Sequence, residues 1–431
     1  MAHTIGDSTD GYPSRKMAGE RQQRSKAPGS GALLLEGSFG EDNSADPEEG
    51  DSESTYTNDV PIVSTSNPIP GDMGATWKGA CQRLVPPQVP ELIVKKVWRS
   101  EKPRAPTDVT LVTQLSVDRM SALANQCAVW GGVVAVAVYV PLVDSSVVSE
   151  DPRLSGAPLS APIKLLEEFF NRQEQSGRCK LDMMYVYEEV PSLDEVGLYP
   201  VNGLRNRALQ LAATDIVALV DADFIPNVQL SEDLADPDHY QVLHRATFNR
   251  QAIVLPALEV LIEGEEGQRL AIKAAEDKEN VRRMMKNDRL QGFHMDGFVN
   301  GHRSTDFPRW LDADVAYQVS YEEGFEPYVM VQRALAPWYD ERFRGYRKNK
   351  VIHLMHMHHL GMSFVVTPRA WVVHVPHKEA DTWRVTQSTG YWKKLKRLYD
   401  TIVKQMAEDT FVPATAFRCQ ERELGKWSWY R

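Results

Sequence analysis

The sequence predicts an α/β fold in which a doubly wound, mostly parallel sheet carries helices on both faces. From about Asp108 onward, short apolar runs rich in Val and Ile alternate with helical stretches, and this order is typical of a parallel sheet. The apolar runs are continuous rather than alternating, as expected of strands buried on both faces. The chain has 431 residues and 42% hydrophobic residues, which is ample for such a core.

The expected elements follow one another in a regular order. Ser116 is a suitable N-cap for a helix that runs toward Trp130. The C-terminal half is richer in aromatic residues and His, and we expect it to complete the fold and form the second wall of a cleft. The remaining expected helices are Ile163–Phe170, 201–213 and a long charged helix from Gln268 to Leu290, and the expected strands are Val109–Val112, Val133–Val140, Leu181–Tyr187, Ile216–Val220 and Ala252–Leu255.

The first 75 residues differ from the rest of the chain. They contain 13 acidic and 5 basic residues and little apolar sequence, so they cannot bury enough surface to offset their ordering entropy. We therefore expect a disordered acidic leader over 1–75, a linker or partly packed extension over 76–107, and a single domain over 108–431. Without the leader the chain has 46 acidic and 44 basic residues, and this near-neutral balance gives no reason to expect a nucleic-acid partner.

Neither a secretory signal nor a membrane span is visible in the sequence. The longest apolar stretch, Ala128 to Val143, is better interpreted as a helix end followed by a buried strand.

The chain has four cysteines, which are Cys81, Cys127, Cys179 and Cys419. They are too few and too widely spaced to predict a disulfide framework or a CxxC metal site. Their number and spacing therefore leave open whether the protein works in an oxidising or a reducing compartment.

The segment Ile216–Phe224 is the most informative part of the chain, because an apolar run ends there in two carboxylates, Asp221 and Asp223. Ligands of open α/β sheets bind outside the carboxyl ends of the strands, so we expect both side chains to project into a cleft. Two hard oxygen donors suit Mg²⁺ or Mn²⁺ bridging the phosphates of a substrate. The alternative is a solvated turn, since Asp often follows a strand.

A helix start at Pro200 precedes this strand. Asn202, Arg205 and Asn206 fall within one turn of the helix, where they could meet a nucleotide or its phosphates. An ordinary polar helix face is the alternative.

Two other motifs could mimic a site. Asp312-Ala313-Asp314 repeats the acidic triplet, but it does not follow a buried strand, and we do not expect it to be the catalytic pair. In the run from His353 to His359, imidazoles spaced along one helix face could bind Zn²⁺. No Cys or carboxylate lies close in sequence to complete that site, so a polar, partly solvated helix is the better prediction.

Several ordered blocks resemble glycosyltransferase family 49, which includes the glucuronyltransferase domain of LARGE-type enzymes and a β-1,4-glucuronyltransferase. The resemblance runs from roughly Asp108 to the end. Its blocks are Tyr199–Asn202 with Leu204–Asn206, Asp221–Pro226, Gly301-His302 with Thr305–Phe307 and Trp310, Phe325–Val329, Tyr339–Phe343, Asn349–Val351 and His374–His377.

This resemblance implies a GT-A fold, a UDP-sugar donor such as UDP-glucuronic acid, a Mn²⁺-type cation and inversion at the anomeric carbon. It also implies that the metal ligand beside Asp221 and Asp223 comes from the turn with His374 and His377, of which His374 is slightly favoured. Three cations could hold the donor phosphates or a uronic carboxylate: Arg205, Arg342 and Lys350. A surface ion-pair residue is the alternative for each.

Inversion needs a base for the acceptor hydroxyl. In many inverting GT-A enzymes an acid opens a helix after a Gly-rich turn, but the matching turn here, 345–350, has no carboxylate. We therefore expect Asp340 or Glu341 to act as the base, with Glu326 as the third candidate. The family usually has Gly-Trp where this chain has Arg347 and Lys348, and this difference concerns acceptor binding.

The sequence thus predicts a metal-dependent inverting glycosyltransferase that moves a sugar, by resemblance glucuronic acid, from a UDP donor to a glycan acceptor. A catalytically inactive nucleotide- or carbohydrate-binding protein on the same fold is the alternative. A nucleotidyltransferase is a third class, but the Gly-rich triphosphate loop it would need is not evident. By resemblance the protein works in the Golgi lumen behind an N-terminal membrane anchor, which the sequence does not show.

Overall fold

The computed structural model describes residues 92–143, 160–190, 197–378 and 381–416. The predicted leader over 1–75 lies outside these residues, as do Cys81 and Cys419. The domain limits stay a prediction. The described end of the predicted extension forms strand β1 (Ile93–Trp98), which pairs antiparallel with β4 (Lys180–Val190).

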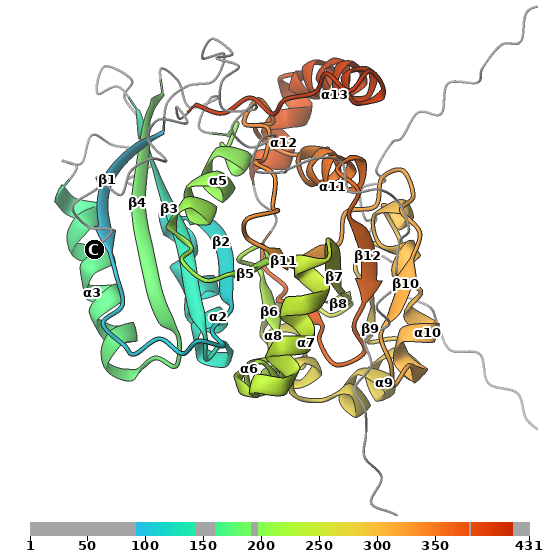
Figure 1. Ribbon diagram of the computed structural model, residues 1–431. Coiled ribbons are helices and arrows are strands. Elements are labelled where there is room, and N and C mark those ends of the chain that lie inside the picture. The colour runs from blue at the N-terminus through green and yellow to red at the C-terminus, as the bar shows by residue number, and fades with distance from the viewer. Residues whose placement is uncertain (1–91, 144–159, 191–196, 379–380, 417–431) are drawn as a thin grey trace, which may run out of the picture. The chain divides into compact units, whose positions relative to one another are not determined.

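A nine-stranded sheet forms the centre of the fold, in the order β1-β4-β3-β2-β5-β11-β7-β12-β10 (Figure 1). Strands β4, β3, β2 and β5 are parallel neighbours; β11 runs antiparallel between β5 and β7, and β7 is parallel to β12. Six strands therefore share one direction, which confirms the predicted doubly wound, mostly parallel sheet of the GT-A type. Besides β1 and β4, the strands are β2 (Thr110–Ser116), β3 (Val133–Val143), β5 (Ile216–Leu219), β7 (Gln251–Leu255), β10 (Tyr317–Val319), β11 (Tyr328–Gln332) and β12 (Ser363–Val366).

A second, four-stranded sheet has the order β6-β13-β8-β9. Because β6 follows β5 directly in sequence, Asp221 and Asp223 lie in the connection between the two sheets. The strands are β6 (Phe224–Pro226), β8 (Ala257–Val260), β9 (Leu290–Gly292) and β13 (Val372–His374).

Helices cover both faces of the main sheet, because successive side chains of a strand point to opposite faces. Ala135 and Ala137 of β3 share a core cluster with α5, whereas Val134 and Val136 share another with α2 and α3. The helices are α2 (Met120–Val129), α3 (Ser160–Ser176), α5 (Val201–Leu211), α6 (Val228–Ala235), α7 (Pro237–Phe248), α8 (Gly264–Glu276), α9 (Lys278–Lys286), α10 (Phe307–Asp312), α11 (Asn349–His359), α12 (Asp381–Ser388) and α13 (Tyr391–Ala407), with short 3₁₀ helices η1 (Val117–Arg119), η2 (Val299–Gly301) and η3 (Arg303–Thr305).

Two expectations about helices were wrong in detail. The long charged helix expected from Gln268 to Leu290 is divided into α8 and α9, because Asp277 is extended and its side chain accepts a hydrogen bond from the backbone N–H of Asn280, which caps α9. Ser116 precedes the 3₁₀ helix η1 rather than an α-helix, and its side chain makes no capping hydrogen bond.

The histidine run forms helix α11, and the helix is partly solvated as expected, with His358 and His359 exposed. The polar character holds only for that end, because His353 and His356 are 1% and 7% exposed: the Tyr339 ring stacks on His353 at 3.5 Å and Phe411 packs edge-on against His356 at 4.8 Å. Burial lowers the pKa of His356 to about 3. Among the described residues these imidazoles belong to no group that could hold a metal ion.

A disulfide joins Cys127, near the end of α2, to Cys179, just before β4. The widely spaced cysteines had not predicted this pairing. The parallel register of β3 and β4 explains it, because Lys180 pairs with Val133 and so brings the two distant segments together. No helix in the described part of the chain is both long enough and apolar enough to cross a bilayer.

Replacing both Cys127 and Cys179 by Ala is expected to lower the free energy of unfolding by about 4 kcal/mol, because the bond closes a loop with a sequence separation of 52 residues. Denaturant titration of the wild type and the double variant measures this loss. Reduction of the wild type should give a similar loss and have no effect on the variant; unchanged stability in both cases would contradict the pairing.

Candidate active site

The side chains of Asp223, His374 and His377 converge where the two sheets meet. Strand β6 pairs antiparallel with β13, and this register sets His374 opposite Phe224, the residue after Asp223. His377 Nε2 lies 3.2 Å from Asp223 Oδ2, and His374 Nε2 lies 3.7 Å from the same atom. Among the described residues, this is the one group of three such side chains whose ligand atoms lie close enough, within 4.8 Å of one another, to share a metal ion.

The chemistry of this group fits a divalent transition-metal cation. One carboxylate oxygen and two imidazole nitrogens suit Mn²⁺ better than Mg²⁺, which prefers oxygen ligands alone. Burial by itself would raise the pKa of Asp223, but the hydrogen bonds from His374 and His377 hold it well below its usual value. The carboxylate is therefore charged at neutral pH, as a metal ligand must be.

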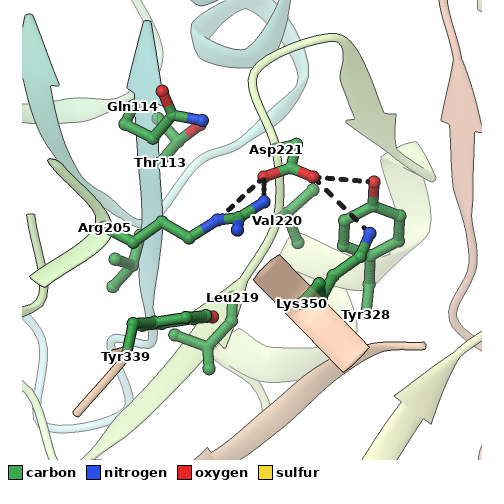
Figure 2. Close-up of a pocket in the computed structure, with 10 residues that line it drawn as sticks. Thr113, Gln114, Arg205, Leu219, Val220, Asp221, Tyr328, Tyr339 and Lys350 are labelled. Atoms are coloured by element: carbon green, nitrogen blue, oxygen red, sulfur yellow. Dashed lines mark hydrogen bonds and ion pairs between the residues drawn. The ribbon is translucent and has the colours of Figure 1, made fainter. Parts of the chain in front are cut away.

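Asp221 takes part in a different set of contacts (Figure 2). Its Oδ1 accepts hydrogen bonds from Nη2 of Arg205 at 2.6 Å and Nε of Arg205 at 3.2 Å. Its Oδ2 accepts one from the Tyr328 hydroxyl at 3.0 Å and lies 3.5 Å from Lys350 Nζ. Burial opposes ionisation, yet the charges of Arg205 and Lys350 lower the pKa of Asp221. Two cations thus surround one carboxylate, which leaves a local positive charge.

The two predicted metal ligands of the acidic triplet are therefore separated. Asp223 faces the imidazoles, while Asp221 faces Arg205 and Lys350. The ring of Phe224 lies between the two groups, with its centroid 4.5 Å from that of Tyr328 and 5.2 Å from that of His374.

A pocket opens beside Asp221 at the carboxyl end of β5, where the sequence had predicted a ligand, and the middle of the neighbouring strand β2 flanks it (Figure 2). Thr113, in this lining, has a buried hydroxyl oxygen without a hydrogen-bond partner in the described part of the chain. A buried polar atom of this kind can bond a ligand that enters the pocket. The lining consists of Val112, Thr113, Gln114, Arg205, Leu219, Val220, Asp221, Tyr328, Tyr339 and Lys350.

Asn202 and Asn206, which we expected to meet the nucleotide, are fully buried and bonded to protein. The Asn206 amide donates to the Tyr339 carbonyl and to Glu341, and its oxygen accepts from the Tyr339 N–H. The Asn202 amide donates to the carbonyl of Asp340, and its oxygen accepts from Arg205. Their side chains hold the segment 339–341 and Arg205 in position.

Asp340 and Glu341, the expected bases, do not line the pocket. The Asp340 carboxylate accepts hydrogen bonds from the Arg342 side chain and from the N–H of Ala414. Glu341 accepts from Asn206 and from the N–H of Ala416. The Glu341 carboxylate thus ties the C-terminal segment to α5, whereas that of Asp340 ties it to Arg342.

Glu326, the third candidate, does not line the pocket either, but its carboxylate differs from both of the others in its contacts. It is partly buried, and its carboxylate has no hydrogen bond to any described residue. Burial raises the pKa of Glu326, an effect that the nearby charge of Lys350 opposes and that of Asp221 reinforces. Gly301 makes room for it, since a Cβ there would come within 3.3 Å of Glu326 Cγ.

The sequence did not reveal Tyr328, Thr113 or His294 as site residues. Tyr328 begins a buried strand, where an aromatic residue is ordinarily core. Thr113 could have been found, because it lies near the carboxyl end of a predicted strand next to β5. His294 belongs to no sequence motif that would mark it. Burial is the main cause that lowers its pKa to about 4, and the charge of Lys350 is the second. The second acidic triplet lies elsewhere, with Asp312 exposed at the end of α10.

Comparison with known proteins identifies the family of the chain. The profile of a family described as "Glycosyl-transferase for dystroglycan" matches residues 159–409, more than half of the chain. The chain therefore belongs to this family of glycosyltransferases, as the ordered blocks had predicted.

Its curated relatives include LARGE-type enzymes. The chain is 30% identical over 321 residues to "Xylosyl- and glucuronyltransferase LARGE2s" of Gallus gallus, covering 74% of this chain and 39% of the relative. It is 32% identical over 303 residues to "Xylosyl- and glucuronyltransferase LARGE1" of Danio rerio, covering 70% and 35%. The chain thus spans less than two fifths of the length of these relatives.

Solved structures that resemble the chain are more distant. GalNAc-T7 with UDP, GalNAc and Mn²⁺ has a TM-score of 0.34 and 11% identity over 74% of this chain and 56% of that one. S. aureus TarS 1–349 with UDP-GlcNAc has a TM-score of 0.31 and 12% identity over 64% and 60%.

Asp223→Asn is expected to weaken Mn²⁺ binding at least tenfold, because the carboxylate is the charged member of the group with His374 and His377. Asp312→Asn is the matched control, since it removes an exposed carboxylate from the other triplet and should leave binding unchanged. Isothermal titration of both variants with Mn²⁺ measures the difference. Loss of binding in the control alone would show that the wrong triplet had been assigned.

Proposed function

We propose that the protein transfers a sugar from a UDP donor to a glycan acceptor, with a Mn²⁺ ion held by Asp223, His374 and His377 and with inversion at the anomeric carbon. The observation that carries the proposal is that Asp223 of this group lies two positions along the chain from Asp221, which lines a pocket with surplus positive charge at the carboxyl end of β5. When bound, the cation offsets the negative charge that develops on the departing diphosphate.

The residues of the pocket suit an anionic donor. Arg205 is held by Asp221, Asn202 and Asn349, so its position is fixed before a ligand binds. Lys350 is 8% exposed and its Nζ lies 3.7 Å from the Tyr328 ring centroid, which keeps the ammonium at the pocket wall. We assign Lys350 to the diphosphate or to a uronic carboxylate of the donor sugar, and Arg205 to the orientation of Asp221 and Asn349. UDP-glucuronic acid is therefore the favoured donor, with UDP-xylose as the alternative.

We assign the base to Glu326 rather than to Asp340 or Glu341, because its carboxylate has no hydrogen bond within the described residues and lies near Lys350 and Asp221. The acceptor hydroxyl transfers its proton to the Glu326 carboxylate while the hydroxyl oxygen forms a bond to the anomeric carbon. The bond from that carbon to the β-phosphate oxygen breaks, and UDP leaves with the electron pair. A raised pKa brings the carboxylate closer to the operating pH, which favours general base catalysis.

We also place the protein in an oxidising compartment such as the Golgi lumen. The Cys127–Cys179 disulfide supports this assignment, because such bonds persist in secretory compartments and are rare in the cytosol.

A screen of UDP-sugars tests the function. With Mn²⁺ and simple xylosides, UDP release is expected to be fastest with UDP-glucuronic acid and to stop when the cation is chelated. UDP binding without release from any donor would instead support an inactive binding protein, and release without Mn²⁺ or Mg²⁺ would contradict the metal assignment.

Glu326→Gln is expected to lower kcat for transfer by about 10²- to 10⁴-fold while leaving UDP and Mn²⁺ binding intact. In the wild type, kcat/KM should fall as the pH drops through the raised pKa of Glu326, because only the deprotonated carboxylate accepts a proton. The pH at the midpoint of this decrease should lie above the ordinary pKa of a glutamate side chain.

Glu341→Gln and Asp340→Asn are the matched comparisons. Both disturb buried hydrogen bonds, so they should lower the melting temperature but keep most of the activity per folded molecule. If Glu326→Gln stays active while one of these loses turnover without loss of stability, the base has been misassigned.

A further inference from the structure

The turn 345–348 has an unusual backbone for its sequence. Gly345, Arg347 and Lys348 have φ values of +70°, +101° and +55°. This region suits glycine, whereas side chains such as those of Arg and Lys are strained there. Neighbouring groups fix the turn, since the Gly345 N–H donates to the Tyr199 carbonyl at 2.8 Å and the Tyr346 N–H to Thr386 Oγ1 at 3.1 Å. Strain that is held in this way is concentrated at functional sites.

Lys348 is connected to the proposed base through Phe298. Its Nζ is 4.8 Å from the centroid of the Tyr399 ring and 5.6 Å from that of Phe298. The Phe298 ring and Glu326 Cγ both lie within 3.3 Å of the position that a Cβ would take at Gly301. Lys348 directly precedes Asn349 and Lys350, which contact Arg205 and Asp221. The turn is therefore continuous with the donor pocket on the side of Glu326, where an acceptor hydroxyl has to arrive.

Arg347 lies beside a partly exposed tryptophan. Its Cζ is 5.9 Å from the centroid of the Trp392 ring, and Lys393 Nζ lies 5.7 Å from the same ring. The Gln387 amide of α12 orients the guanidinium, because its oxygen can accept from Nε and Nη2 of Arg347 at 3.1 and 2.9 Å. An aromatic face can cover the apolar face of a sugar, and a guanidinium suits carboxylate or phosphate oxygens.

The positive charge continues along the first turns of α13, which packs against α11 and α12 (Figure 1). The acidic residue on this stretch, Asp400, is paired with Lys396 at 3.0 Å. Since residues 76–431 are nearly neutral as a whole, this is a local concentration of charge. Its exposed members are Lys393, Lys394, Lys396 and Arg397.

We propose that Arg347, Lys348, Trp392 and Lys393 form an acceptor subsite that selects glycans with a negatively charged group, a carboxylate, phosphate or sulfate, close to the hydroxyl that is extended. This proposal rests on the proposed function only in calling the bound glycan the acceptor. The charge of the subsite matches such a group, and the Trp392 ring holds the cations of Arg347 and Lys393 on one half-buried surface. Lys348 joins this surface to the Phe298 ring, which flanks Gly301 together with Glu326.

The test measures binding to the full chain with Mn²⁺ and UDP at saturating concentration, so that the nucleotide pocket is filled. The probes are methyl β-D-glucopyranoside, its 6-phosphate and 6-sulfate, and methyl β-D-glucuronide. At least one charged probe is expected to bind tenfold more tightly than the neutral glucoside, and the ranking of the three identifies the group that is recognised.

The double variant Arg347→Gly/Lys348→Asn removes both charges and places residues that tolerate positive φ in the turn. It should lose the preference for charged probes, keep UDP affinity within twofold and have an unchanged or higher melting temperature. A purely structural role for the two residues would instead lower the melting temperature and leave the preference intact. Lys404→Ala, which removes an exposed cation farther along α13, is the control and should behave like the wild type.

Equal binding of charged and neutral probes by the wild type would overturn the proposal. The proposal would also be overturned if the double variant kept the preference for charged probes, or if Lys404→Ala lost that preference to the same extent. Because the readout is binding, a chain without transferase activity can still show the preference for charged probes. Failure of the proposed function and failure of the proposed subsite are therefore distinguishable.

Discussion

The antiparallel pairing of β6 with β13 is the constraint on which the candidate site depends. It joins a segment just after the first acidic triplet to one about 150 residues later, and it sets His374 opposite Phe224. The Val375 N–H also donates to the Asp223 carbonyl at 2.8 Å, so backbone contacts fix both segments. His374 therefore stands on a strand, and Asp223 and His377 lie within three residues of the paired strands, so a rigid element positions the group, as precise metal geometry requires.

The network around Arg205 connects the rest of the site to this junction. Arg205 bonds Asp221 on one side and Asn202 and Asn349 on the other. Through these contacts, helix α5, the acidic triplet and the start of α11 form one polar unit. Lys350 completes it, so the pocket beside Asp221 has one carboxylate between two cations, while Asp223 points to the imidazoles. The acidic triplet thus serves two tasks, and each carboxylate has its own set of partners.

The sequence predicted the central strands and the position of the acidic triplet, because continuous apolar runs and a strand-end motif are local signals. It could not separate Asp221 from Asp223, since Tyr328 and Lys350 lie more than 100 residues away in sequence. The same limit hid the Cys127–Cys179 pair, which depends on the register of β3 and β4. Asp340 and Glu341 looked catalytic because their motif is acidic, but only the fold shows that their carboxylates bind the backbone of Ala414 and Ala416.

The most direct measurement of the central claim is the anomalous scattering of Mn²⁺ in crystals of the full chain grown with MnCl₂ and UDP. The account predicts one strong peak within coordination distance of a carboxylate oxygen of Asp223 and of a ring nitrogen of His374 or His377, with the diphosphate on its open side. Bound UDP with no peak at these three side chains, or a peak at Asp312 and Asp314 instead, would contradict it.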